Sequence, residues 1–212
     1  MIRGNGWKET KALKKQKKRQ FKQEKNSIWW LLPIIFAIAV IPLIVQFRVE
    51  PSELGKYGWY SNATRYMELF SSCKRDAIAF LDLLLLGGLS YLAYKKEIPK
   101  QMALIPLGGY TVLIVLSSFF TVDTFITWNG FEGMRESAFV LLGYCMIFLY
   151  TYTVVKTEEQ VKKVMFAFFI GVSILCLIGV FQFLGTNFYM TDFGKSLIFS
   201  EEYKAYADAM VE

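Results

Sequence analysis

The chain has 212 residues, of which 54% are hydrophobic and 17% aromatic, and its mean hydropathy is +0.34. Soluble domains are usually about 45–50% apolar, so this composition argues against a water-soluble globular protein. Histidine does not occur, which removes the commonest general base and metal ligand, and the three cysteines follow no zinc-site or disulfide spacing. We therefore expect no metal and no cofactor.

The first segment of the chain, residues 1–25, is strongly basic. It carries ten Lys or Arg against two Glu, a charge of +8, so the remaining residues sum to −2 of the total of +6. The basic segment could be an arm that binds nucleic acid, or it could precede the apolar part of a signal peptide. The segment has few aromatic residues, and the apolar run after it exceeds the roughly 7–15 residues of a signal peptide. We therefore expect a cytoplasmic segment that faces anionic lipid, a retained first helix and no nucleic-acid partner.

Five stretches that follow are nearly free of charge. Residues 26–47, 101–122, 137–155 and 164–191 carry none, and 77–94 carries only Asp82. About 20 apolar helical residues cross the roughly 30 Å hydrocarbon core, and a helix satisfies its own backbone in lipid. The sequence therefore predicts an all-α, polytopic membrane protein whose membrane region is residues 26–184. The five transmembrane helices are expected at about 28–47, 77–94, 102–121, 137–155 and 164–184.

The orientation follows from the lysines and arginines near the helix ends. It places the N-terminus in the cytoplasm and the segments 48–75, 122–135 and 185–212 outside, in a bacterial cytoplasmic membrane. Segment 48–75 departs from the rule, because it carries five basic residues. We expect 185–212 to be an extracytoplasmic segment that stops before further helices.

Asp82 is the charge that needs an explanation in the second stretch. It lies six residues, or about 9 Å of helix, beyond Asp76. A carboxylate at that depth costs on the order of 1–3 kcal/mol unless it is paired or hydrated. One interpretation is a polar pocket that opens outward, with Arg75 on the same helix face and Arg135 approaching from the same side. The other is a helix that begins late, with Asp82 at the interface.

The stretch "ITWNGFEGMRESAF", residues 126–139, places Arg135 and Glu136 where the fourth helix should begin. A cation is unfavourable at a helix N-terminus, because that end of the helix dipole is already positive. A bound phosphate would be attracted both to the arginine and to the helix N-terminus. Arginine can hold a phosphate with two parallel hydrogen bonds, and Gly130 and Gly133 allow close backbone approach. We expect Arg135 to bind a phosphate-bearing ligand on the outer face; an arginine that merely reaches lipid headgroups is the alternative.

The stretch 116–185 also carries a family pattern. A serine-containing outer helix end is followed by a Gly, by an Arg and Glu before an apolar helix with Gly-Tyr, and by a polar inner turn and another helix. The matching residues are Ser117, Ser118, Gly130, Arg135, Glu136, Gly143 and Tyr144. Over roughly residues 28–190 the chain resembles the N-terminal half of the O-antigen ligase and polymerase family of bacterial membrane proteins.

The resemblance implies transfer of a glycan from undecaprenyl pyrophosphate to an acceptor sugar, without a metal, on the outer side of the membrane. Outward arginines hold the carrier's pyrophosphate in this family, which gives Arg135, Arg75, Asp82 and Glu136 as substrate-binding candidates. Family members have more helices and a catalytic histidine, so we expect these 212 residues to be an inactive N-terminal portion. Ligation and polymerisation both stay open.

Two other functions remain as alternatives. The first is a non-enzymatic polytopic membrane protein, either a transporter fragment or an assembly subunit. In that case Asp82 lines a conducting path and no lipid-linked sugar binds. The second is a structural anchor whose charges only determine its topology.

Overall fold

The computed structural model of the chain describes residues 28–52, 54–56, 63–95, 97–99, 101–186 and 188–203. The expected basic segment 1–25 lies outside these residues, as does the end of the expected extracytoplasmic segment.

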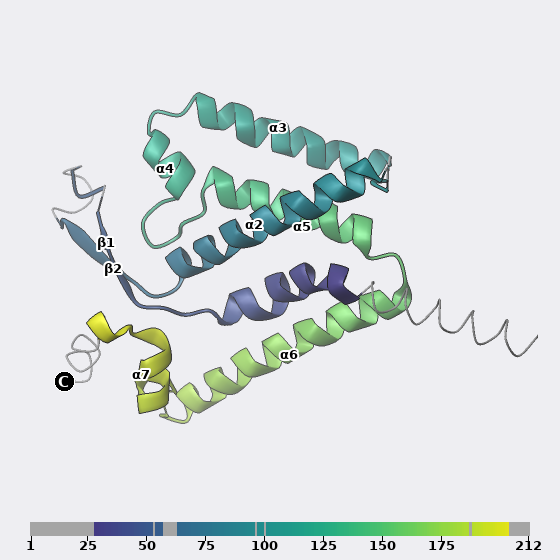
Figure 1. Cartoon of the computed structure of the whole chain (residues 1–212). Coiled ribbons are helices and arrows are strands. Elements are labelled where there is room, and N and C mark those ends of the chain that lie inside the picture. The colour runs from purple at the N-terminus through teal and green to yellow at the C-terminus, as the bar shows by residue number, and fades with distance from the viewer. Residues whose placement is uncertain are drawn as a thin grey trace, which may run out of the picture.

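Five long helical segments run back and forth between the two ends of an elongated bundle (Figure 1). They are Ile28–Leu43, α2 (Ser71–Tyr94), α3 (Ile105–Phe119), α5 (Ala138–Val154) and α6 (Glu158–Phe183). Two short helices, α4 (Thr124–Asn129) and α7 (Asp192–Ile198), and the 3-10 turns Leu54–Lys56, Met102–Leu104, Phe188–Met190 and Glu201–Tyr203 complete the helical part. Two strands, β1 (Arg48–Pro51) and β2 (Arg65–Glu68), form a small antiparallel sheet.

Each of the five nearly charge-free stretches overlaps one of the five long segments, so the mostly helical architecture is confirmed. Within the described residues, α2 with 24 residues and α6 with 26 are long and apolar enough to cross a membrane. The helices α3 and α5 are shorter, at 15 and 17 residues. Five membrane crossings therefore remain a prediction.

The sheet is a feature that the all-α prediction missed. Its register pairs Arg48 with Glu68 and Glu50 with Tyr66, so the hydrogen-bonded strands are short and largely polar. A strand that buries little apolar surface lacks the hydrophobic alternation by which strands are recognised. The segment was therefore expected to be an outer loop.

The core of the bundle lies where α2 packs against α5 and the first helical segment. Buried Leu31, Ile78, Leu81, Leu85 and Val140 form its centre. The Tyr150 hydroxyl donates a hydrogen bond of 3.0 Å to the Trp30 carbonyl, and the Trp30 ring stacks on Tyr91. These contacts place the start of the first segment beside the end of α2.

The first helical segment changes its winding before it ends. Phe36–Val40 is a π-helical turn, and Ile41–Leu43 is a 3-10 turn with Pro42 near its start. A π turn holds an extra residue and rotates the helix face on either side of it. Leu31 and Ile34 consequently pack in the core, while the π turn itself lies against α6.

Helix α6 is attached to the bundle mainly by its contact with the π-helical turn of the first segment. Gly171 is the buried residue of this helix, and a Cβ atom there would lie 3.1 Å from the Ala39 Cα. Small residues of this kind allow close helix approach in membranes. Most other apolar side chains of α6 are exposed, Phe166 by 68%, although Val164 packs against the core.

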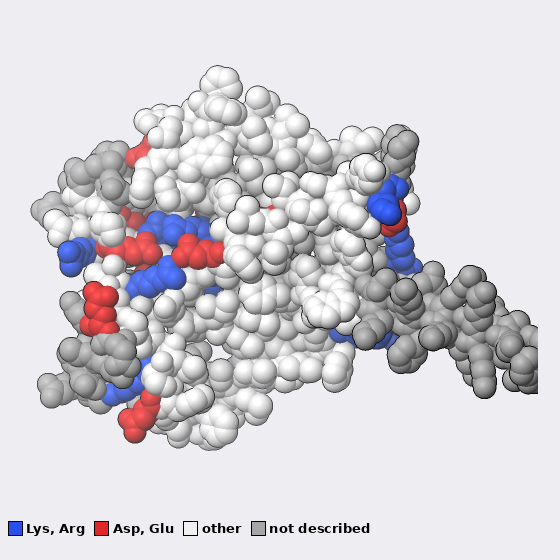
Figure 2. Space-filling model, in the orientation of Figure 1, with Lys and Arg blue, Asp and Glu red and all other residues white. Residues whose placement is uncertain are grey.

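Charged side chains gather at the two ends of the bundle and leave an apolar belt between them (Figure 2). The hairpin end, named for β1 and β2, carries Arg48, Glu50, Arg65, Glu68, Lys74, Arg75, Asp76, Asp123, Glu132, Arg135, Glu136, Asp192, Lys195 and Glu202. The opposite end, here the Lys156 end, carries Lys95, Glu97, Lys156, Glu158, Glu159, Lys162 and Lys163. Of the described charged residues, only Asp82 lies between the ends. Such a wide exposed apolar surface is rare in soluble monomers and supports membrane association.

The close approach at Gly171 generates a prediction. Gly171→Leu should lower the free energy of unfolding by about 1–3 kcal/mol, because the added side chain forces α6 away from Ala39. Thermal unfolding in detergent measures the change. Gly179→Leu is the matched control, since a Cβ at Gly179 meets open space on the same helix. Equal unfolding temperatures for the two variants would show that the contact contributes nothing.

Candidate functional site

The turn between α4 and α5 has an unusual backbone. Gly130 and Gly133 have φ angles of 81° and 84°, and Arg135 has a φ of 51°. A Cβ atom on Gly130 would lie 2.5 Å from the Arg135 backbone, so only glycine allows the turn to close on itself. The amide of Arg135 donates to the Phe131 carbonyl at 2.8 Å, which holds this left-handed conformation in place.

Arg135 lies in this turn and not at the helix N-terminus. Helix α5 begins at Ala138, and the Ser137 side chain caps it by accepting a hydrogen bond from the Val140 amide. The argument that an arginine at the helix end needs a phosphate therefore does not apply to the observed backbone.

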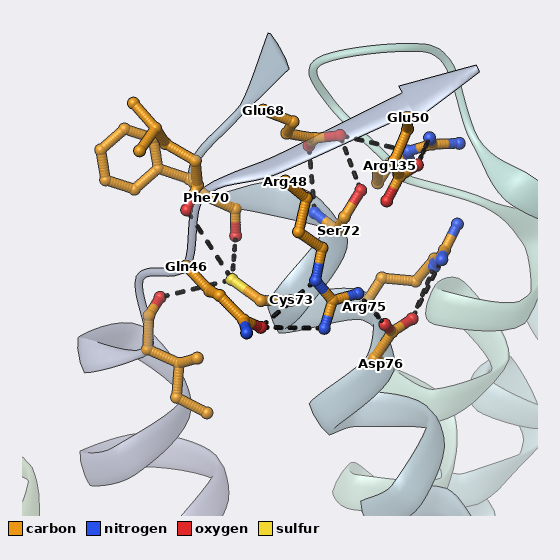
Figure 3. Close-up of polar contacts among 12 residues, drawn as sticks. Gln46, Arg48, Glu50, Glu68, Phe70, Ser72, Cys73, Arg75, Asp76 and Arg135 are labelled. Carbon is orange, nitrogen blue, oxygen red and sulfur yellow. Dashed lines mark hydrogen bonds and ion pairs between the residues drawn. The ribbon is translucent and has the colours of Figure 1, made fainter. Parts of the chain in front are cut away.

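The Arg135 side chain instead contacts the β-hairpin. It is only 5% exposed and forms ion pairs with Glu50 on β1 and Glu68 on β2, the latter at 3.5 Å (Figure 3). Its guanidinium lies 5.3 Å from the centre of the Tyr66 ring, and the Tyr66 hydroxyl donates to Glu50 at 3.0 Å. Two carboxylates and an aromatic face thus occupy the positions where we expected a phosphate.

Glu68 connects this cluster to α2. Its carboxylate accepts hydrogen bonds from the Ser72 amide at 3.0 Å and the Ser72 hydroxyl at 2.6 Å (Figure 3). An anion at the first turn of a helix pairs with unsatisfied amides and with the positive end of the helix dipole. Glu68 therefore stabilises the start of α2 and neutralises Arg135 at the same time.

Glu132 attaches the same turn to a third segment. It is buried, and its carboxylate accepts hydrogen bonds from the Ser52 hydroxyl at 2.9 Å and the Leu54 amide at 3.0 Å. The turn 130–137 thus holds the segment after β1 through Glu132 and the strands through Arg135. We call this arrangement the clamp.

Arg75 and Arg48 form a second, more open cluster at the hairpin end. Both donate to the Asp76 carboxylate, Arg75 at 3.0 Å, and Arg48 also donates to Gln46 (Figure 3). The side chains of Arg75 and Asp76 are 22% and 44% exposed. Arg75 and Arg135, both expected to bind substrate, are therefore at the same end of the bundle but have different carboxylate partners.

Asp82 does not join either cluster. Helix α2 begins at Ser71, so Asp82 is in its interior and the interpretation of a late helix start is wrong. Asp82 is 3% exposed, and among the described residues neither of its carboxylate oxygens has a hydrogen-bond partner. A Cβ on Gly143 would lie 2.4 Å from Asp82 Oδ2, so Gly143 of α5 makes room for the carboxylate. Nothing in the sequence spacing identified this pair.

Glu136 lines a pocket of about 440 Å³ between α3, α4 and α5. Ser117 and Ser118 of α3 and Thr127 of α4 also line it. Glu136 is exposed. The pocket brings together two serines and a glutamate that the family pattern contains, and it adds Thr127, which the sequence gave no reason to select.

The residues offer little to a metal ion. Across the described residues no group of three Cys, Asp or Glu side chains is arranged to hold one.

The sequence matches no family model and no curated protein, and the fold matches no solved structure.

The clamp generates a prediction about stability. Arg135→Ala should lower the free energy of unfolding by about 3 kcal/mol, because it leaves Glu50 and Glu68 facing each other without a cation. Thermal unfolding in detergent measures the loss, and increased proteolysis of the hairpin would locate it. Arg65→Ala is the control, since Arg65 is an exposed cation on the same hairpin. An Arg135→Ala protein as stable as the control would contradict the clamp.

Proposed function

We propose that this chain is the N-terminal portion of a membrane glycan ligase or polymerase. The full protein would transfer a glycan from undecaprenyl pyrophosphate to an acceptor sugar on the outer face of a bacterial cytoplasmic membrane. The observation that supports this most is the pocket of Glu136. Ser117, Ser118 and Glu136, through which the sequence resembles the O-antigen ligase and polymerase family, line one cavity at the hairpin end.

Membrane insertion with the hairpin end outside is the first part of the proposal. The five helical segments all run between the two charged ends, as five crossings require. The Lys156 end is where the first segment begins, directly after residues 1–25 with their charge of +8. Basic residues are retained in the cytoplasm, so the Lys156 end is inside and the hairpin end outside.

The pocket at Glu136 has the chemistry of a sugar site. The Ser117 hydroxyl can donate and accept hydrogen bonds, whereas the Ser118 and Thr127 hydroxyls already donate to backbone carbonyls and are left as acceptors. The glutamate accepts two or more hydrogen bonds from sugar hydroxyls. Tyr110 and Leu113 add an apolar wall. We assign Glu136 to the binding of glycan hydroxyls.

The pyrophosphate is assigned to Arg75 and Arg48 in preference to Arg135. A phosphate can displace the half-exposed Asp76 at little cost, because exposed ion pairs contribute about 0–1 kcal/mol. Removing the carboxylates from buried Arg135 would cost several kcal/mol. Arg135 then acts as a framework residue that holds the hairpin over the membrane.

The proposed reaction places these arginines at the leaving group. The acceptor hydroxyl attacks the anomeric carbon, the bond from that carbon to the phosphate oxygen breaks, and negative charge develops on the departing pyrophosphate. A preorganised guanidinium stabilises that charge. No residue is assigned to remove the proton from the acceptor hydroxyl.

The second candidate is a non-enzymatic membrane protein, either a transporter fragment or an assembly subunit. Asp82 favours it, because ionisable side chains in the interior of membrane proteins commonly mark ion paths or helix contacts. This candidate predicts no binding of lipid pyrophosphate.

The orientation can be tested with single cysteines in a chain whose three native cysteines are replaced by Ser. Val122→Cys, at a fully exposed position of the hairpin end, should react with an impermeant maleimide in intact cells. Glu158→Cys, at the Lys156 end, should react only after the cells are opened. The reverse result would place the pocket and the arginines in the cytoplasm, and the proposed function would be wrong.

Ligand binding can be tested with the purified chain in nanodiscs and radiolabelled undecaprenyl pyrophosphate. We expect binding at least about tenfold tighter than for undecaprenol, and a loss of about five- to tenfold in Arg75→Ala, as for one charge-assisted hydrogen bond. Lys74→Ala, the adjacent cation over the Phe70 ring, is the control and should bind normally. Equal binding of pyrophosphate and alcohol would exclude this chain as the carrier site.

A further inference from the structure

The position of Asp82 calls for a partner. Asp82 is the twelfth of the 24 residues of α2, about 16 Å from the first of them. The residue is 97% buried by the described residues, and its carboxylate oxygens have no hydrogen-bond partner among them. An unpaired carboxylate in an apolar interior is unfavourable by several kcal/mol, and this cost is relieved either by protonation or by a donor or cation beside it.

Asp82 lies in the wall of a groove of about 620 Å³. The groove runs between α3 and α5 for two to three helical turns, and apart from the carboxylate its lining is uncharged. The lining residues are Leu104, Leu107, Gly108, Thr111, Val112, Phe139, Leu142, Cys145, Met146 and Leu149, together with Asp82. The groove thus offers a long apolar surface with a single ionisable group, whose oxygens lie just beneath that surface.

The shape of the groove suits a helix. Gly108 adds no side chain, and a Cβ atom there would meet open space. Thr111 is also small, and its hydroxyl donates to the Leu107 carbonyl of its own helix. Small residues along one face of a membrane helix let a second helix approach closely.

The described helices contain no cation that could reach Asp82 in the groove. Lys74 and Arg75 of α2 lie at the hairpin end, and Lys162 and Lys163 of α6 lie at the Lys156 end. A second copy of the chain would bring the same helices and the same lack of a central cation. A lipid acyl chain could fill the groove but has no group that donates to a carboxylate.

We propose that the groove binds a transmembrane helix from outside these 212 residues that carries one Lys or Arg near its midpoint, and that this cation pairs with Asp82. The apolar face of the partner helix covers Val112, Phe139 and Met146, and the ion pair determines its depth. The inference rests on the membrane insertion proposed above but does not depend on glycan transfer.

A synthetic helix tests the proposal directly. Apolar Leu–Ala peptides of membrane-spanning length carry Lys, Leu or Glu at the centre, and the affinity-tagged chain is held in nanodiscs of phosphatidylethanolamine and phosphatidylglycerol. Retention of each labelled peptide with the chain is measured. We expect the Lys peptide to bind about fivefold more tightly than the Leu peptide, as for one polar contact between membrane helices, and the Glu peptide to bind most weakly.

Two variants and one control variant show whether the groove is the site. In Asp82→Asn, the Lys peptide and the Leu peptide should be retained about equally. Gly108→Phe should weaken binding of the Lys peptide, because the added ring fills the groove. Gly179→Phe, also in open space but on α6, should leave this binding unchanged. If Asp82→Asn does not fold, the comparison of Gly108→Phe with Gly179→Phe still shows whether the peptide binds in the groove.

Three results would overturn the proposal. They are equal retention of the Lys and Leu peptides by the native chain, an unchanged preference in Asp82→Asn, and identical behaviour of the two glycine variants. Lipid alone in the groove, with every peptide excluded, would have the same meaning. Because the assay contains no lipid-linked glycan, its failure is distinguishable from failure of the proposed glycan transfer.

Discussion

The buried guanidinium of Arg135 is the interaction on which the hairpin end depends. It joins residues that are 67 and 85 positions apart in the chain, and each of its carboxylate partners has another role. Glu68 also stabilises the start of α2, and Glu50 also accepts from Tyr66. Because all these groups are partly or fully removed from water, the network is stable only when it is complete. The sharp turn at Gly130 places the Arg135 side chain against Glu50 and Glu68.

Under the proposed membrane insertion, the rest of the molecule follows from a different constraint, which is that lipid offers no hydrogen bonds. Long uninterrupted helices satisfy their own backbones, and their apolar side chains can face outward at no penalty. This explains how α6 can be almost wholly exposed and still belong to the bundle through Gly171 and Ala39. It also explains why the polar contacts are concentrated at the two ends. A single carboxylate between those ends is therefore far more informative than any charge at the surface.

The helices could be predicted from the sequence because their signal is local. A long run of apolar residues predicts a helix whatever it later packs against, and all five runs overlap one. The contacts of the site could not be predicted in this way. The partners of Arg135 and the fit of Gly143 against Asp82 depend on long-range packing, and a short polar hairpin resembles a loop. The two-residue spacing that places Arg48 with Glu50, and Tyr66 with Glu68, on one face of a strand was the one available sign of strands. Ser117, Ser118 and Glu136 were correctly placed at one end by topology, although their common pocket was not foreseen.

The π-helical turn at Phe36–Val40 makes the first segment sensitive to length as well as to composition. One residue fewer in this turn would restore regular α-helix and rotate everything before it by about 100° relative to everything after it. Leu31 and Ile34 would then leave the core, although no side chain had been substituted. Insertions and deletions of one residue here would thus change the rotation of the first helix about its own axis. Descendants of this gene that changed length at this point would have to remodel the surface facing α2 before they could fold again.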